Sequence, residues 1–549
     1  MDSSKYTLTL PKYIPNKGLS QDEQREKEFG SLESPEFLYV SEHEPNTPYL
    51  VEPLEEPSYF TILLTHLNFL ILIIVGNFKD FFGTFFDKKQ FEDVIEKDGY
   101  APYYSRLESF YVRRMKRKID DNFSIPTTGV PGRYITCYDR HSDDYNQTLK
   151  YTGSVTNCLN FASYNYLGFA QSVGICTDDA LVTLRKYGTG AGAPRHQGGT
   201  TDKHAELEKL VAKFVGKDDS LIFSQGFSTN ANLFDSFLDS ECLVISDELN
   251  HSSIRTGLRI SGVTIKRFPH NNMAKLEKII RTSISQGLPR THKPWKKIIV
   301  CVEGLYSMEG TMCPLPQLVD LRDKYGFYLF VDEAHSIGAM GPNGRGVCDY
   351  FNIDPSRIDI LMGTFTKSFG AAGGYVAAEQ HIIDRLRLDL TAPVYSESIS
   401  PVIVSQILTS MKIIMGELNP GEGKERIQRI AFNSRYLRAG LKKLGFIAFG
   451  MDDSPVIPLL LYVPNKLPAV ARALYKRGIA VVIVGYPATP IDSSRIRICV
   501  SAALTKSDLD KVLRELDFIG DKMYFKYARG KHNMEPFTDK PNATLEAFH

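Results

Sequence analysis

The sequence has almost no net charge and no paired cysteine motif, and each absence excludes a class of protein. Its 65 Lys and Arg residues balance 64 Asp and Glu residues, so no overall positive field marks the 549-residue chain as a nucleic-acid-binding protein. Its eight cysteines are scattered without a C-x-x-C pair, which argues against a disulfide framework or a structural zinc site. We therefore expect no nucleic-acid partner, no metal, and a catalytic part in a reducing compartment.

Apolar residues are abundant enough for folding, since 43% of the chain is hydrophobic and 11% aromatic. From about residue 157 short apolar runs alternate with glycine turns and amphipathic helical patterns. Strands are expected at 220–226, 242–247, 263–268, 297–304, 327–334, 359–365 and 373–379. This alternation predicts an α/β large domain over 157–404, with a mostly parallel sheet that binds its ligand at the carboxyl ends of the strands.

Composition divides the rest of the chain into five further regions. We expect an acidic, largely irregular arm at 1–57, a membrane-anchoring segment at 58–80, a linker with helices and strands at 81–156, a smaller C-terminal α/β domain at 405–525, and a polar tail at 526–549.

The membrane-anchoring segment is an uncharged stretch from Pro57 to Phe78. Twenty helical residues cover roughly 30 Å, about one hydrocarbon core. A buried core helix or a helix lying on the membrane surface is the alternative. Basic residues follow, including the run at 113–118, and they predict a cytosolic location for the rest of the chain if the segment spans. A solvated helix face explains the basic run equally well.

Lys367 lies in GTFTKSFGAAGG, after an apolar strand and before a run of small residues. A lysine removed from water has the lowered pKa that Schiff-base chemistry requires. A plain surface lysine is the alternative for this segment alone. A P-loop requires glycine directly before the lysine, and Thr366 occupies that position.

Three further segments place polar residues at predicted strand ends. Asp332 ends the run FYLFVD, where a buried carboxylate needs a cation, and His335 follows three residues later. Gly226 breaks another strand into a helix whose free N–H groups favour a phosphate. His251 follows a third strand and could stack on a flat cofactor. Taken singly, a helix cap, an empty strand-to-helix turn and a structural histidine explain these features as well.

Taken together and in order, the segments resemble the pyridoxal-phosphate-dependent α-oxoamine synthase family, which includes aminolevulinate synthase and 8-amino-7-oxononanoate synthase. The matching motifs are GFSTN (226–230), NHSS (250–253), EGLYSMEG (303–310), VDEAHSIG (331–338) and GTFTKSFG (363–370). The resemblance implies a fold-type I transferase with pyridoxal 5'-phosphate as cofactor, and it covers nearly the whole chain.

The resemblance also implies roles for individual residues. Lys367 would carry the cofactor as a Schiff base, Asp332 would pair with its ring nitrogen, His251 would stack on the ring, and His335 would contact its phenolic oxygen. These four residues are the expected catalytic residues. The remaining cofactor contacts would come from Gly226, Phe227, Ser307 and Thr364. The expected substrate contacts are Arg497 for the carboxylate, together with Tyr164 and Asn165.

Two positions depart from the family pattern. GAGAPRHQGG places Ala193 and Pro194 before Arg195, and Leu504 stands where relatives often have histidine. A salt-bridged sheet arginine remains the alternative for Arg497. The roles of these segments stay open.

Among family members, the acidic arm, the apolar segment and GYPATP are most similar to lysine-bearing subunits that condense serine with a fatty acyl-CoA. This similarity implies a decarboxylative acyltransferase of sphingolipid synthesis in the endoplasmic reticulum membrane, facing the cytosol. It also implies a homologous partner that lacks the lysine, and small membrane regulatory subunits. The rivals are a family member that uses glycine or alanine, and a non-catalytic membrane scaffold.

Overall fold

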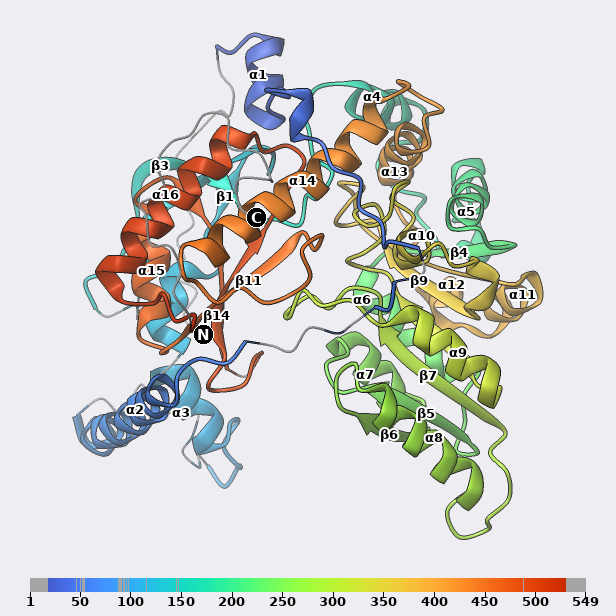
Figure 1. Ribbon diagram of the computed structural model, residues 1–549, viewed down its shortest axis with the longest axis horizontal. Coiled ribbons are helices and arrows are strands. Elements are labelled where there is room, and N and C mark those ends of the chain that lie inside the picture. Colours follow the sequence, from blue (N-terminus) through green and yellow to red (C-terminus); the bar gives the residue numbers. More distant parts are fainter. Residues whose placement is uncertain are drawn as a thin grey trace.

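The computed structural model describes residues 18–529, apart from 46, 50, 52–54, 87–90, 92, 93, 95, 97, 115, 145, 147 and 487. Residues 1–17 of the predicted arm and 530–549 of the predicted tail lie outside the described residues. The described strands form sheets of seven, four and three strands (Figure 1).

The seven-stranded sheet forms the centre of the large domain, and all seven predicted strands are present in it. They are β4 (Asp219–Phe223), β5 (Cys242–Asp247), β6 (Thr264–Phe268), β7 (Lys297–Glu303), β8 (Tyr328–Asp332), β9 (Ile360–Thr364) and β10 (Gly374–Ala378). The order is β4-β10-β9-β8-β7-β5-β6. Strand β10 runs antiparallel to both neighbours and the other pairs are parallel, so the sheet is mixed at one edge.

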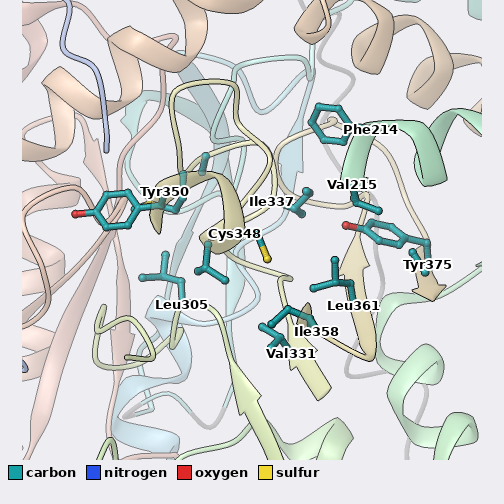
Figure 2. Close-up of a cluster of buried hydrophobic side chains, with 14 of the residues drawn as sticks. Phe214, Val215, Leu305, Val331, Ile337, Cys348, Tyr350, Ile358, Leu361 and Tyr375 are labelled. Carbon is teal, nitrogen blue, oxygen red and sulfur yellow. The ribbon is translucent and has the colours of Figure 1, made fainter. Parts of the chain in front are cut away.

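Helices cover both faces of this sheet, which explains why β5 and β9 are buried along their whole length. They are α4 (Ile175–Tyr187), α5 (Asp202–Val215), α6 (Gly226–Leu233), α7 (Ser252–Ile260), α8 (Met273–Gln286), α9 (Leu315–Tyr325), α10 (Val347–Phe351), α11 (Gln380–Asp389), α12 (Thr391–Tyr395) and α13 (Pro401–Ile414), with short 3-10 turns at η5 (Arg195–Gln197), η6 (Phe234–Ser236) and η7 (Pro355–Arg357). Figure 2 shows part of the core, where Val331 of β8 and Leu361 of β9 gather with Ile358 and Cys348.

The small domain pairs the sheet β11-β14-β13 with three helices. Its elements are α14 (Glu422–Lys443), β11 (Val456–Tyr462), α15 (Lys466–Tyr475), β13 (Val482–Val484), β14 (Ser494–Cys499) and α16 (Lys506–Met523). Thr505 and Asp508 form a capping box that fixes the start of α16. Buried leucines of α16, including Leu509, Leu513 and Leu516, pack into the same core as β11 and β14.

The four-stranded sheet has the order β1-β2-β3-β12 and joins the N-terminal region to the small domain. Its strands are β1 (Thr127–Thr128), β2 (Tyr134–His141), β3 (Lys150–Asn160) and β12 (Ile479–Ala480). The preceding helices are α1 (Gln21–Glu28), η2 (Pro35–Phe37), α2 (Tyr59–Phe86), α3 (Arg106–Arg114) and η4 (Lys116–Asn122).

Helix α2 is the one described helix that is long and apolar enough to cross a membrane. One stripe of it is nevertheless buried, since Thr61, Thr65 and Phe69 face the protein and α2 contacts β11. Further along, a Cβ at Gly76 would contact Phe110 of α3. The opposite face exposes Leu63, Leu67, Leu70 and Ile74, among other apolar residues. The helix therefore has a protein-facing side and an apolar outer side.

The acidic arm is irregular outside its short helices, but it is not solvated throughout. The Phe29 ring lies against the guanidinium groups of Arg426 and Arg429 on α14, at 4.2 and 4.6 Å. Further on, the His43 N–H donates to the Tyr350 carbonyl in α10 of the large domain (2.9 Å). The arm thus contacts both domains.

Candidate active site

The candidate site lies at the carboxyl ends of the central strands. Glu303, Asp332 and Thr364 are the last residues of β7, β8 and β9. His251 caps the start of α7, directly after β5, and Gly226 is the first residue of α6. The parallel sheet brings these strand ends to one edge, as the sequence predicted.

Asp332 is a buried carboxylate with two hydrogen-bond donors. Its Oδ1 accepts the Ala334 N–H (2.9 Å), and its Oδ2 accepts from the Asn230 side-chain amide (2.7 Å). The residue is 3% exposed and forms no salt bridge within the described part of the chain. An ionised carboxylate is costly to bury without a cation, so this geometry favours a positively charged ligand.

Lys367 is the third residue after β9. Removal of its amine from water lowers the pKa of Lys367 to about 8, although the nearby carboxylates of Asp332 and Glu303 oppose the shift. The amine lies 5.5 Å from the centre of the Tyr164 ring. A lysine with this pKa is partly neutral near pH 7, as a Schiff-base lysine must be.

His335 is buried among aromatic side chains. Its Nδ1 is hydrogen-bonded to the Tyr166 hydroxyl (2.8 Å), and burial raises the pKa of Tyr166 well above its usual range and keeps the phenol protonated. Burial also lowers the pKa of His335 well below its usual value. The imidazole is therefore neutral.

His251 stands at the mouth of the site. Its Nδ1 accepts the Ser253 N–H (3.2 Å) and lies 2.8 Å from the Ser253 hydroxyl. Desolvation lowers the pKa of His251, while the Asp332 carboxylate opposes the shift. The Phe227 ring lies edge-on to the imidazole, with 6.2 Å between the ring centres.

Gly226 and Thr364 form a tight corner. A Cβ at Gly226 would lie 2.9 Å from the Thr364 methyl carbon, so the close approach of the α6 start to β9 requires glycine. The Thr364 hydroxyl donates to the Ala334 carbonyl over a long 3.4 Å, and the free N–H groups of the first α6 turn can donate to an anion at this corner.

Two arginines alternate on β14. Arg495 is paired, since it donates to the Met308 carbonyl (2.7 Å) and lies 3.5 Å from the Glu309 carboxylate. Arg497 forms no salt bridge within the described residues, and its Nε has no hydrogen-bond partner. Its guanidinium lies 4.6 Å from the Tyr164 ring centre. The salt-bridged alternative considered for Arg497 therefore describes Arg495 instead.

Ser307 and Asn165, two further predicted site residues, have different surroundings. Ser307 is buried on the loop that follows β7, beside the segment that Arg495 holds. The Asn165 amide donates to the Pro131 carbonyl and accepts the Ala170 N–H, both at 3.1 Å, so it is engaged with the backbone. Their proposed contacts with cofactor and substrate remain predictions.

The sequence prediction did not include three buried polar residues of this site. They are Tyr166, Asn230 and Glu303. The Glu303 carboxylate accepts the His251 backbone N–H (2.5 Å), and burial together with the Asp332 charge raises the pKa of Glu303 well above its usual value. Its position offered a signal, because Glu303 ends a buried strand just as Asp332 does.

With this geometry established, comparison with known proteins defines the class. The aminotransferase class I and II family matches residues 156–516, which include every residue of the site. Serine palmitoyltransferase 2 of Kluyveromyces lactis and that of Saccharomyces cerevisiae are each 58% identical to the chain, over 94% of its length and 92% of theirs. A solved structure of SPT with a PLP internal aldimine superposes with a TM-score of 0.66 at 27% identity, and covers 77% of this chain and 100% of the other. The chain belongs to the serine palmitoyltransferase branch of the aminotransferase class I and II family.

Proposed function

We propose that the chain is the lysine-bearing catalytic subunit of a serine palmitoyltransferase. It would condense L-serine with palmitoyl-CoA to give 3-ketosphinganine, CoA and carbon dioxide, with pyridoxal phosphate as cofactor. The observation that carries the proposal is that the parallel strands β8 and β9 bring Lys367 and the buried Asp332 to one edge of the sheet, where Asp332 forms no salt bridge with any described residue.

The residues present fit pyridoxal phosphate. The protonated ring nitrogen of the cofactor would supply the cation that the buried Asp332 carboxylate lacks among the described residues. The corner at Gly226 and Thr364 suits the phosphate of the cofactor. His251 would stack on the ring, and Lys367 would hold the aldehyde carbon. When bound, the cofactor supplies an electron sink for negative charge that develops at the substrate α-carbon.

The chain's own groups would manage the proton and the substrate. The Lys367 amine, with its pKa near 8, is suited to remove the serine α-proton and later to return one. Neutral His335 would donate from Nε2 toward the cofactor's oxygen. Arg497 would grip the serine carboxylate with its planar fork, beside Tyr164. Fixing that carboxylate determines which bond at the α-carbon is broken.

Two other functions make different predictions. A family member that uses glycine or alanine would have the same cofactor residues but would prefer the smaller amino acid. A non-catalytic scaffold would need neither Lys367 nor Asp332. The identity to proteins named serine palmitoyltransferase over nearly the full chain, and the apolar outer side of α2, support the serine enzyme.

The direct test is a peptide map combined with an assay of the purified complex. After borohydride reduction, the pyridoxyl group should be on the Lys367 peptide, and serine should be preferred over glycine and alanine with palmitoyl-CoA. Labelling of another lysine would exclude the assigned role of Lys367. A preference for glycine or alanine would exclude the substrate while leaving the cofactor site intact.

We propose a homologous, lysine-lacking partner subunit for this chain. Exposed apolar side chains lie on α4, including Leu181 and Val182, and Tyr395, within the segment PVYSESISP (393–401), is 76% exposed at the end of α12. An obligate interface of more than about 2,000 Å² would cover such surfaces. The chain expressed alone should show little condensation activity, and co-expression with the partner should restore it. Full activity from a pure homodimer would contradict the proposal.

We propose that α2 anchors the chain in the endoplasmic reticulum membrane, with the catalytic domain in the cytosol, where small membrane subunits would bind near it. Substituting Leu63, Leu70 and Ile74 with Glu should release the protein from carbonate-washed membranes, because charged residues on an apolar helix face oppose lipid insertion. Ile284→Glu, on an exposed part of α8, is the matched control. Retention of the triple variant, or protection of the large domain from protease in sealed microsomes, would contradict this placement.

A further inference from the structure

A chain of buried polar groups lies behind the proposed cofactor residues. Asn230 on α6 and Ser253 on α7 are 1% and 2% exposed and connect Asp332 with His251. We propose that Asn230 and Ser253 are positioning residues that join Asp332 and His251 into one hydrogen-bonded unit. This inference rests on the proposed function, in which Asp332 and His251 hold two parts of one cofactor.

The side-chain N–H groups of Asn230 determine which atoms donate and which accept along this series of hydrogen bonds. Its Nδ2 lies 2.7 Å from Asp332 Oδ2 and 3.0 Å from the Ser253 hydroxyl. A carboxylate can only accept, so the amide nitrogen must face Asp332 and give it one N–H. The second N–H then goes to the Ser253 oxygen.

The Ser253 hydroxyl has one proton, and it must go elsewhere. The Ser253 backbone N–H can only donate, and it bonds to His251 Nδ1 at 3.2 Å, so this nitrogen is an acceptor. The hydroxyl, 2.8 Å from the same nitrogen, therefore donates its proton to it. Both donors require an unprotonated Nδ1, so His251 carries its proton on Nε2. The orientation of Asp332 and the tautomer of His251 are therefore linked.

Helix packing keeps the two positioning residues within bonding distance. A Cβ on Gly257 of α7 would clash with the Asn230 carbonyl on α6 and would lie 2.9 Å from the Phe234 ring. The absence of a side chain at Gly257 lets the two helices approach closely. The amide orientation also has a cost, because the Asn230 Oδ1 is buried without a hydrogen-bond partner among the described residues. The hydrogen bond from Asn230 to the Asp332 carboxylate offsets that cost.

As a consequence, Asp332 and His251 are already oriented before the cofactor binds. Two of the Asp332 lone pairs are occupied by the amide of Asn230 and the N–H of Ala334, which fixes the plane of the carboxylate. Removing either positioning residue should therefore disturb both Asp332 and His251. Removing both residues should therefore weaken cofactor binding little more than removing one of them.

A double-mutant cycle on the purified heterodimer tests this link. Asn230→Ala and Ser253→Ala should each weaken the Kd for pyridoxal phosphate about tenfold, as outer hydrogen-bond partners of binding residues typically do. The double variant should also be weakened about tenfold, because coupled residues are not additive. The visible circular dichroism of the bound cofactor, which reports ring orientation without turnover, should change alike in all three variants.

Two further variants separate positioning from a general loss of stability. Ser253→Thr retains the hydroxyl and should return the circular dichroism band and the Kd toward wild type. Ser410→Ala removes an equally buried hydroxyl in α13, bonded to the Ile407 carbonyl (3.1 Å), and should leave both unchanged. The kcat of the Ser253→Ala variant should fall while its KM for serine stays within about twofold, since Arg497 is untouched.

The outcomes are distinguishable from failure of the proposed function. A hundredfold, multiplicative loss in the double variant, or a Ser253→Ala variant identical to wild type, would overturn the network while wild-type serine condensation stood. Absence of pyridoxyl on any lysine of the wild-type protein would overturn both.

Discussion

The large-domain and small-domain sides of the site are built differently. On the large-domain side, Asp332, His335 and Glu303 each bond to a residue from another part of the fold, at 2.5 to 2.8 Å. On the small-domain side, Arg497 contacts the Tyr164 ring and a methionine sulfur but has no carboxylate within salt-bridge distance among the described residues. The first side is held in place by hydrogen bonds within the protein, whereas the Arg497 guanidinium has neither a salt bridge nor a hydrogen bond from its Nε among the described residues.

The contrast is not a property of strand β14, because Arg495 on the same strand is paired with Glu309. Preorganised donors and charges suit a cofactor that stays bound through many turnovers. An unpaired, largely buried guanidinium suits a substrate that arrives and leaves with its own carboxylate. The two sides thus correspond to the proposed division between cofactor and substrate.

The largest expected effect comes from the rigid side. Lys367→Ala should abolish condensation and covalent attachment of the cofactor, because no other amine can take its place. Lys217→Ala is the matched control, since desolvation also lowers the pKa of Lys217, but its amine donates to the Ile358 carbonyl outside the site. Reduction with borohydride followed by mass spectrometry measures attachment. Pyridoxyl-labelled protein from Lys367→Ala would contradict the assignment.

Asp332→Asn should follow in magnitude. The variant removes the negative charge proposed to face the ring nitrogen while keeping the size of the side chain, so α-proton exchange of serine should slow by about 10³-fold. Asp453→Asn provides the comparison, because Asp453 is equally buried but pairs with Arg435 in the small domain. That variant should lower Tm and leave exchange intact. Wild-type exchange in Asp332→Asn would give Asp332 another role.

On the small-domain side, substitution of Arg497 should change the KM for serine rather than the affinity for the cofactor. Arg497→Lys keeps the charge but loses the planar fork, and hydrogen bonds to charged groups contribute about 1.5–3 kcal/mol, so the KM for serine should rise roughly tenfold or more. Arg495→Lys should lower Tm instead, because Arg495 binds the loop that carries Met308. Equal effects of both variants on KM would remove the distinction between the two arginines.

The Lys367 amine should make the rate of cofactor uptake depend on pH. Only the neutral amine attacks an aldehyde, and the pKa of Lys367 is lowered to about 8. Uptake of pyridoxal phosphate by the cofactor-free enzyme should therefore level off above pH 9 and fall about tenfold for each pH unit well below 8. Stopped-flow absorbance measures the rate. A midpoint near pH 10 would show an amine that is not desolvated.

Sequence reasoning predicted the large-domain side well for a physical reason. Buried parallel strands are continuous apolar runs, so β5, β7 and β8 were visible as such, and the polar residues at their ends had to meet at one edge. The family resemblance implied that Lys367 and Asp332 act in one site, and the topology places both at this edge of the sheet. The antiparallel strand β10 was located correctly, but its direction is not encoded in local periodicity.

Other features depend on contacts between distant segments and left no local pattern. The acidic composition of the arm predicted a largely irregular segment and gave no sign of its contacts, yet Phe29 and His43 contact two different domains. Helix α2 reads as uniformly apolar, and only the structure shows which stripe faces β11. Asn230 was part of a recognised motif, but its bond joins helix α6 to the end of strand β8, 102 positions further along the chain.

The smallest expected effect concerns Tyr166, which supports His335 from behind. Tyr166→Phe removes the hydroxyl that is hydrogen-bonded to Nδ1 but keeps the ring, and burial still holds the imidazole neutral, so kcat should fall only about three- to tenfold. The KM for serine and the borohydride label on Lys367 should be unchanged. Tyr436→Phe, whose hydroxyl bonds to Asp510 in the small domain (2.5 Å), controls for loss of a buried phenol. A loss as large as that of Asp332→Asn would show that Tyr166 acts directly in the chemistry rather than by orienting His335. No change at all would mean that packing alone fixes the imidazole, and the large-domain side would then owe less of its rigidity to hydrogen bonds than the contrast with Arg497 suggests.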